Sequence, residues 1–110
     1  MDRQYLTDFE LMILLAILRI GDDAYGAPIA AELEAVGRRS VLLGTVYAAL
    51  DRMETRGLVS SRIGEPTARR GGKAKRFFAV TPKGLAAVQG TRKALTALWT
   101  GVRALKSRPA

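Results

Sequence analysis

The sequence predicts a mainly α-helical domain with one small β-hairpin (α+β), in the order helix, helix, helix, hairpin, helix. Three apolar-periodic segments, each followed by a glycine, occupy residues 7–57. Two short runs rich in β-forming residues, 58–63 and 75–80, flank a loop rich in glycine and arginine, as in a hairpin with a long tip. Thr81 and Pro82 then begin a last helix, because threonine caps helices and proline suits their first position.

The first helix is expected from Thr7 to about Ile20. Thr7 and Glu10 have the spacing of a capping box, in which each side chain bonds the backbone of the other residue. Gly21 ends the segment. Apolar residues cover most of the circumference, which indicates burial on all sides. One face should meet the core, and another should meet a second chain or the C-terminal helix.

The second helix is expected over about 25–36, with Ile29, Leu33 and Val36 as its inward stripe. Residues at this spacing lie on one side of a helix, so they mark the side that packs against the core. The connector over 38–42 is long enough for one very short strand, and the sequence leaves that point open.

The third helix, expected over about 44–56, has two contrasting sides. Its core side comprises Val46, Leu50 and Met53, with Leu43 and Ala49 flanking them. Its free side comprises Gly44, Thr45, Ala48, Asp51 and Arg52, with Tyr47 at the edge. Small residues near the start of the free side would let the helix approach a partner closely. Gly57 follows in the position that favours a left-handed C′ residue.

The last helix is expected over 82–105, followed by a frayed tail. Val88, Leu95 and Val102 recur every seven residues along it, and Leu98 and Leu105 lie three positions after the last two, as in a coiled-coil seam. A seam of this kind is most simply covered by a second copy of the chain. The predicted dimer interface comprises Leu11, Leu15, Val88, Leu95, Leu98, Trp99, Val102 and Leu105.

Composition excludes several classes of function. The chain has 110 residues, enough for one domain, and no cysteine or histidine. Disulfides, thiolate metal sites and thiol nucleophiles are therefore absent, as are the commonest general base and transition-metal ligand. We expect no metal, no cofactor and no enzymatic activity. The longest apolar run, 11–18, is too short to cross a membrane and no leader is visible, so we expect a cytoplasmic protein without a membrane partner.

Charge is distributed unevenly along the chain. The net charge is +8, but residues 1–65 carry seven basic and ten acidic groups, whereas residues 66–110 carry eleven basic groups and no acid. This asymmetry favours a polyanionic partner, and the alternative is a solvated basic surface. Segment 62–76 concentrates six of the basic residues, with glycines between them that would let a loop follow a phosphate backbone.

Three helices followed by a two-stranded hairpin form the winged helix-turn-helix arrangement. In this arrangement the third helix enters the major groove, and the loop between the strands, the wing, contacts the backbone or the minor groove. Double-stranded DNA is therefore the expected partner. The predicted organisation is a DNA-binding domain over 1–81 and a C-terminal dimerisation helix with its tail over 82–110.

Each candidate residue also has a structural alternative. Thr45, a candidate for a phosphate or thymine contact, has the residue type of a helix cap. Tyr47, a candidate phosphate donor, could be a half-buried core residue. Arg52, the best candidate for a guanine or phosphate contact, could instead pair with Glu34, Asp51 or Glu54. Trp99 either packs in an interface or stacks on a planar ligand.

Three stretches together resemble the PadR family of bacterial transcriptional regulators, over about residues 6–88: "LTDFELMILLAILRIGDDAYGAPIAAEL", "LLGTVYAALDRMETRGLVSS" and "KRFFAVTPKGLAAV". The step at 44–47, the pair Tyr25-Gly26 and the helix start at 81–84 carry the resemblance. It implies a homodimer in which the C-terminal helix packs with the first helix. It also implies a repressor of a palindromic operator, often released by a small, commonly aromatic effector.

The resemblance also assigns site residues by position. The DNA-reading helix maps onto Thr45, Tyr47, Ala48 and Arg52, and the wing onto Arg69, Arg70, Lys73 and Lys75. The complete predicted DNA-binding set comprises Ser40, Thr45, Tyr47, Ala48, Arg52, Arg69, Arg70, Lys73 and Lys75, with Trp99 as the ligand-binding candidate. Many members have proline where this chain has Ala48, and the single short C-terminal helix resembles the compact branch, without a large effector domain.

Two other classes of function compete with a DNA-binding regulator. A winged helix can serve as a protein-protein interaction module, which would bind all DNA sequences alike. An enzyme is the weakest alternative, because no convergent set of carboxylates, lysine or serine is visible, and Asp22-Asp23 has the composition of a turn.

Overall fold

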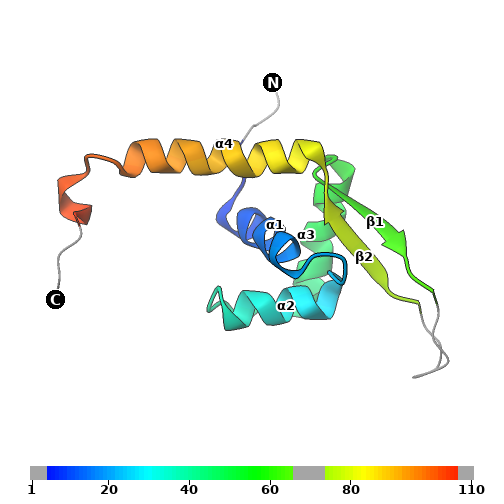
Figure 1. Ribbon diagram of the computed structural model, residues 1–110. Coiled ribbons are helices and arrows are strands. Elements are labelled where there is room, and N and C mark those ends of the chain that lie inside the picture. The colour runs from blue at the N-terminus through cyan, green and yellow to red at the C-terminus, as the bar shows by residue number, and fades with distance from the viewer. Residues whose placement is uncertain (1–4, 66–73, 107–110) are drawn as a thin grey trace.

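The computed structural model describes residues 5–65 and 74–106 (Figure 1). Its elements are, in chain order, α1 (Asp8–Ile20), α2 (Gly26–Ala35), α3 (Leu43–Thr55), β1 (Val59–Ile63), β2 (Arg76–Val80), α4 (Pro82–Trp99) and the 3₁₀ turn η2 (Arg103–Leu105). This confirms a mainly α-helical fold with one hairpin in the predicted order. Among the described residues, no helix is long and apolar enough to cross a membrane.

Helix α1 begins and ends where its local signals predict. The Thr7 hydroxyl accepts a hydrogen bond from the Glu10 amide at 3.2 Å, and the Glu10 carboxylate accepts one from the Thr7 amide at 2.9 Å. Gly21 follows with φ +88°, a backbone conformation that glycine adopts without strain. The capping box is thus formed on both sides, and the helix start rests on contacts within four residues.

The core lies between α1, α2, α3 and the hairpin. Its fully buried side chains include those on the predicted inner side of α3 and on the inner stripe of α2: Val46, Leu50, Met53 and Ile29, with Ala49 and Leu33 close behind. Two expectations are wrong. Leu43 is 44% exposed because it starts α3, and Val36 is 52% exposed because α2 ends at Ala35, before the stripe reaches it. Residues 38–42, which the structure describes, form no strand.

The two strands form an antiparallel hairpin that extends from the C-terminal end of α3 toward the loop before α2 (Figure 1). Val59 pairs with Val80 at the end near the C-terminus of α3, and Ile63 pairs with Arg76 at the other end. Gly57 adopts φ +79° between α3 and β1, as its predicted C′ role requires. The hairpin therefore starts at the C-terminal end of α3, and its strands pass beside that helix.

Helix α4 is shorter than predicted. It ends at Trp99, because Thr100 is extended and Gly101 adopts φ +85°, which breaks the helical hydrogen-bond pattern. The Thr96 carbonyl accepts hydrogen bonds from both the Thr100 amide, at 3.0 Å, and the Thr100 hydroxyl, at 2.8 Å, and the helical pattern stops there. Val102 and Leu105 consequently lie outside the helix, and the continuous seam expected to reach Leu105 is wrong beyond this break.

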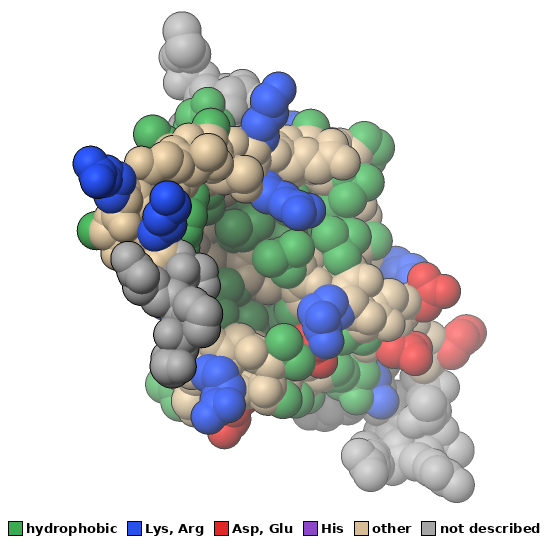
Figure 2. Space-filling model, turned by 60° about the vertical axis from the view of Figure 1, so that its left-hand side comes forward, with side chains coloured by type: hydrophobic (Ala, Val, Ile, Leu, Met, Phe, Trp, Pro, Cys, Tyr) green, Lys and Arg blue, Asp and Glu red, His purple; other side chains and the backbone are tan. Residues whose placement is uncertain are grey.

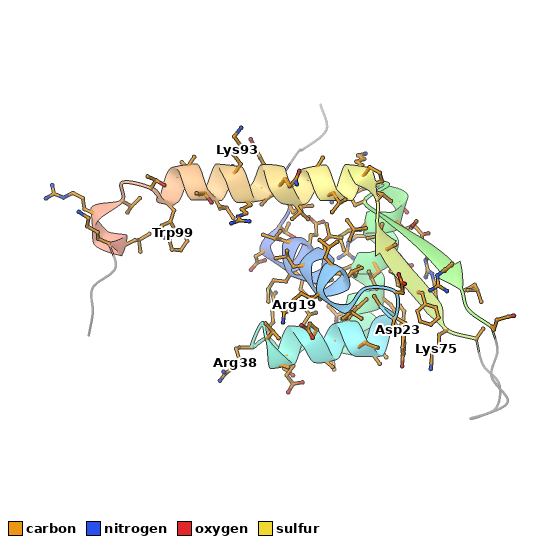
Figure 3. The ribbon with its side chains drawn as sticks, viewed as in Figure 1. Arg19, Asp23, Arg38, Lys75, Lys93 and Trp99 are labelled. Carbon is orange, nitrogen blue, oxygen red and sulfur yellow. The ribbon has the colours of Figure 1, made fainter. Side chains whose placement is uncertain are left out.

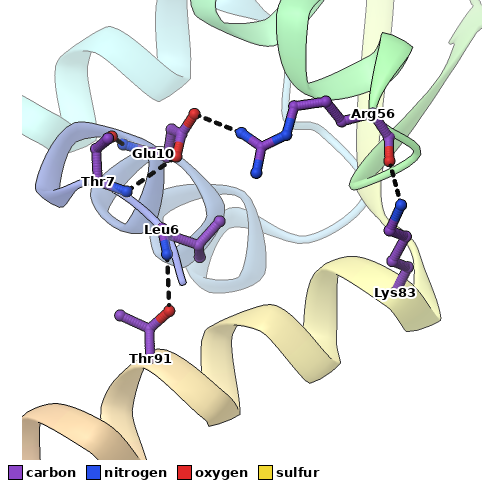
Figure 4. Close-up of polar contacts among 6 residues, drawn as sticks. All are labelled: Leu6, Thr7, Glu10, Arg56, Lys83 and Thr91. Atoms are coloured by element: carbon purple, nitrogen blue, oxygen red, sulfur yellow. Dashed lines mark hydrogen bonds and ion pairs between the residues drawn. The ribbon is translucent and has the colours of Figure 1, made fainter. Parts of the chain in front are cut away.

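The first half of α4 is attached to the body by polar contacts between segments far apart in sequence (Figure 4). The Leu6 amide donates to the hydroxyl of Thr91, which is 4% exposed, at 3.0 Å. The Lys83 ammonium donates to the Arg56 carbonyl at 2.9 Å, and Arg56 donates to the Glu10 carboxylate at 2.7 Å. The second half of α4 projects beyond the three-helix body (Figure 1).

Candidate nucleic-acid interface

The free side of α3 is exposed as the sequence predicts. Gly44, Thr45, Ala48, Asp51 and Arg52 all lie on the surface, and a β-carbon added to Gly44 would meet no atom within 4 Å. Small exposed residues at the start of a helix allow close approach to a groove. Ser40 is also exposed, in the connector that leads into this end of α3.

Thr45 does not cap α3. The helix begins at Leu43 with Leu42 as its N-cap, and no side chain bonds the first turn. The Thr45 amide donates to the Leu42 carbonyl at 3.0 Å, so this threonine already lies inside the helix. Its hydroxyl is therefore not used in the role that was the main alternative to a DNA contact.

Tyr47 is half-buried, in agreement with its predicted position at the edge of α3. Its ring packs against Gly26 at the start of α2, where an added β-carbon would overlap ring carbon and hydroxyl atoms. The same ring is tilted against Phe78, with centroids 6.4 Å apart. Tyr47 thus joins α3 to α2 and to the hairpin, which is the packing role named as its alternative.

Arg52 is exposed, and the described residues offer it no ion pair. Two of its three predicted acidic partners, Asp51 and Glu54, instead contact Arg76. The third, Glu34, lies exposed on α2. The guanidinium of Arg52 therefore remains available on the outer surface of α3.

The base of the wing is braced by aromatic rings. The Lys75 ammonium lies 4.8 Å from the ring centroid of Tyr25, and the Arg62 guanidinium lies 4.5 Å from that of Phe77. The Tyr25 and Phe77 rings meet edge to face at 5.6 Å, and Arg62 also donates to the Asp22 carbonyl at 3.2 Å. Figure 3 shows Lys75 where β2 begins, near the loop before α2.

Three of the predicted wing residues, Arg69, Arg70 and Lys73, lie outside the described residues. The two ends of this segment are placed, because Gly64 donates to the Lys75 carbonyl at 2.8 Å and thus extends the hairpin past the last strand pair. The base of the wing therefore lies beside the loop before α2.

Arg76 is a residue of this surface that sequence reasoning missed. From β2 it donates to the Asp51 carboxylate at 2.9 Å and forms a second ion pair with Glu54, both on α3. The Ser61 hydroxyl of β1 donates to Glu54 at 2.7 Å. Asp51 and Glu54 lie three positions apart, on one side of α3, and this spacing was the signal in the sequence for a shared basic partner. The register of the hairpin is what brings Arg76 opposite them.

The second candidate surface is a groove between α1 and α4. It has a volume of about 470 Å³, and Figure 2 shows hydrophobic side chains gathered in the hollow beneath α4. Five predicted interface residues line it: Leu11, Leu15, Val88, Leu95 and Trp99. Leu98, also predicted for the interface, is not among the lining residues and is 74% exposed. Arg92 contributes a positive charge to the lining, and Trp99 lines the groove from the last position of α4 (Figure 3).

The sequence over residues 14–90 matches the model of the transcriptional regulator PadR-like family. The chain belongs to this family. This PadR-like protein is accordingly a transcriptional regulator with a DNA-binding fold, and the family is one of regulators rather than enzymes. No match was found among curated proteins.

Solved structures share the fold of this PadR-like chain. A transcriptional regulator from Clostridium thermocellum is 21% identical, with a TM-score of 0.69 over 90% of this chain and 91% of that one. A PadR-like regulator from Bacillus cereus is 24% identical, with a TM-score of 0.68 over 92% and 93%. A complex structure of hsRosR is 28% identical, with a TM-score of 0.65 over 87% and 76%. The winged-helix arrangement predicted from the order of elements is thereby confirmed.

Proposed function

We propose that the protein is a homodimeric repressor that binds a palindromic operator and is released by a small aromatic ligand. Residues 1–81 would bind DNA and residues 82–110 would mediate dimerisation. The observation that carries the proposal is the pairing of two surfaces on one fold: an exposed recognition side on α3 and an apolar groove along the projecting α4.

DNA recognition is assigned to the exposed side of α3 and to the wing. Thr45 and Ala48 would approach base edges, and Arg52 would contact a guanine or a phosphate. The basic wing residues would contact the phosphate backbone: Lys75, and also Arg69, Arg70 and Lys73, which lie outside the described residues. Ser40 and the Tyr47 hydroxyl would add phosphate contacts. All ten acidic residues lie at or before Glu65, which leaves the later part of the chain uniformly basic.

The homodimer is supported by apolar surface that one copy leaves uncovered. Leu98 and Trp99 are 74% and 63% exposed on the projecting half of α4, next to the groove lined by Leu11 and Leu15. Apolar surface of this kind usually marks an interaction site. A two-fold axis would place the α4 of each copy over the groove of the other and set two α3 helices about 34–36 Å apart.

The same groove is the proposed ligand site. Trp99 offers a planar indole face at one end, and the leucines from both helices offer apolar walls. A ligand bound there would sit between the proposed dimer partners, where it could change the separation of the two recognition helices. Release from the operator would follow from that change.

The test is fluorescence anisotropy with a duplex from upstream of the protein's own gene and a scrambled duplex of equal length, at two salt concentrations. We expect tighter binding to the upstream duplex at both concentrations. The logarithm of affinity should fall by about 0.9 per phosphate contact for each tenfold rise in salt. Equal binding to both duplexes would contradict the proposal and favour an interaction module.

Replacing Arg52 by alanine should weaken binding to the preferred duplex by about 1–3 kcal/mol if its guanidinium reads a guanine. The scrambled duplex should be affected less, because a base contact contributes only at the correct sequence. The same anisotropy titration measures both affinities. Equal losses on the two duplexes would show that Arg52 contacts phosphate only.

A further inference from the structure

Arg76 connects the hairpin to the recognition helix in two ways: through the nitrogens of its guanidinium group and through the flat face of that group. One nitrogen contacts Asp51 at 2.9 Å, and a second contacts Glu54 three residues further along α3. The plane of the group lies over the Phe78 ring, with its central carbon 4.8 Å from the centroid. Phe78 is buried in the core and meets Tyr47 of α3. One side chain of β2 thus contacts α3 twice directly and once through the core.

Ser61 completes this connection from the other strand. It lies opposite Phe78 in the antiparallel register, and its hydroxyl donates to Glu54 at 2.7 Å. Glu54 therefore bonds both strands of the wing, one through each of its oxygens. We call the set Arg76, Ser61, Asp51 and Glu54 the wing clamp.

We infer that the wing clamp is a positioning device: it holds the hairpin at one angle to α3 and thereby sets how strongly the protein prefers its operator. This inference rests on the proposed function. A hairpin that is already positioned lowers the cost of binding when α3 and the hairpin must contact one duplex together. Binding to the operator requires that α3 contact the base edges while the hairpin contacts the backbone at a matching position. Binding to a random duplex requires only phosphate contacts, which tolerate many arrangements.

The alternative role for Arg76 is a direct phosphate contact, and the geometry disfavours it. Each of its two terminal nitrogens donates to a carboxylate, and about two-thirds of its side-chain surface is covered. The hydrogen bond from Ser61, and then the bond and charge of Arg76, outweigh the effect of burial and hold the pKa of Glu54 below its ordinary value. Glu54 is therefore ionised at neutral pH, and it competes with any phosphate for Arg76.

The two roles predict opposite changes in DNA affinity when Glu54 is replaced by glutamine. Removing an acidic charge from a DNA-binding surface should strengthen DNA binding through charge alone. Glu54→Gln should instead weaken binding to the preferred duplex by about fivefold, since the hairpin loses the charged partner of Arg76 and Ser61 on α3 and keeps only the Arg76–Asp51 ion pair. The control is Glu34→Gln, which removes the same charge from an exposed site on α2 and should not weaken binding. Tighter or unchanged operator binding by Glu54→Gln would overturn the inference.

A second variant keeps the charge of the protein constant. Arg76→Lys replaces a planar fork by a single point charge, which cannot bridge two carboxylates as arginine does. We expect about fivefold weaker operator binding with scrambled-duplex binding unchanged. Lysine contacts phosphate well, so a variant that binds the operator like wild type would also overturn the clamp.

Amide hydrogen exchange tests the clamp without DNA. Glu54→Gln should speed exchange in β1 and β2, whereas Glu34→Gln should not, because only the first loosens the hairpin from α3. Unchanged exchange in the strands would overturn the clamp. Failure to prefer any operator would count against the proposed function alone, because the exchange measurement does not depend on it.

Discussion

Replacing Leu98 by aspartate should convert the proposed dimer to monomers. Leu98 is the most exposed large apolar residue on α4, so most of its side chain is free to contact a second copy. A buried, unpaired carboxylate in the interface between two copies would cost several kcal/mol, which exceeds what most such interfaces can lose. Sedimentation velocity should show a monomer where the wild-type chain shows a dimer.

Loss of the dimer should have a large effect on operator binding. Two linked half-site contacts bind more tightly than one by on the order of 100-fold or more, without any new contact. Anisotropy should therefore show at least about that loss on the palindromic duplex. Thermal unfolding of the monomer fold should change little, because an exposed substitution usually shifts stability by less than about 0.5 kcal/mol.

Ala97→Asp is the matched control for this experiment. Ala97 neighbours Leu98 on α4 and is also exposed, but it lies about 100° around the helix from Leu98 and outside the predicted seam of Val88, Leu95 and Leu98. The same charge is thus added to the same turn of the helix on another side. A dimeric Leu98→Asp variant, or dissociation by both variants alike, would contradict the proposed seam.

Replacing Gly84 by alanine should strongly destabilise the protein. A β-carbon at Gly84 would overlap the carbonyl oxygen of Leu58 and lie 2.8 Å from a methyl carbon of Val80. The carbonyl belongs to the backbone at the start of the hairpin and cannot rotate away. Overpacking of this kind costs about 1–3 kcal/mol and sometimes more. For a domain of this size, each kcal/mol lowers the midpoint of thermal unfolding by about 4–8 °C.

Gly90→Ala provides the control on the same helix. A β-carbon at Gly90 would meet no atom within 4 Å, so only helix propensity changes. Alanine is favoured over glycine inside a helix by about 1 kcal/mol, and the midpoint should stay the same or rise. Circular dichroism melts measure both variants. A Gly84→Ala protein that melts with the wild type would show that α4 does not rest on the backbone at Leu58.

Local signals were sufficient to predict where most elements begin and end. The capping box at Thr7, the Thr81-Pro82 start and the left-handed Gly57 each involve backbone groups within a few residues, so the sequence states them directly. The two sides of α3 also followed from helical periodicity, because the core needs one apolar side whatever it packs against. From the order of these elements, the winged-helix arrangement could be predicted.

The end of α4 could not be predicted from periodicity. The apolar spacing continues through Val102 and Leu105, although the backbone leaves the helix at Thr100 and Gly101. A repeat of apolar residues shows which residues would lie on one face of a helix. It does not show whether the backbone hydrogen bonds of the helix continue through those residues. The interface prediction therefore keeps its groove residues on α1 and α4 but loses the continuous helix at its end.

Local contacts and composition specify the set of elements, the inner side of each and the basic character of the later chain, so all three could be predicted from the sequence. Which distant groups meet depends on how these elements pack together. Arg76 faces Asp51 and Glu54 because the hairpin passes beside α3. Tyr47 packs on Gly26 because the start of α2 lies against α3. An ion pair or a close contact depends on distance in space, and residues up to 85 positions apart, such as Leu6 and Thr91, are brought together only when the core assembles.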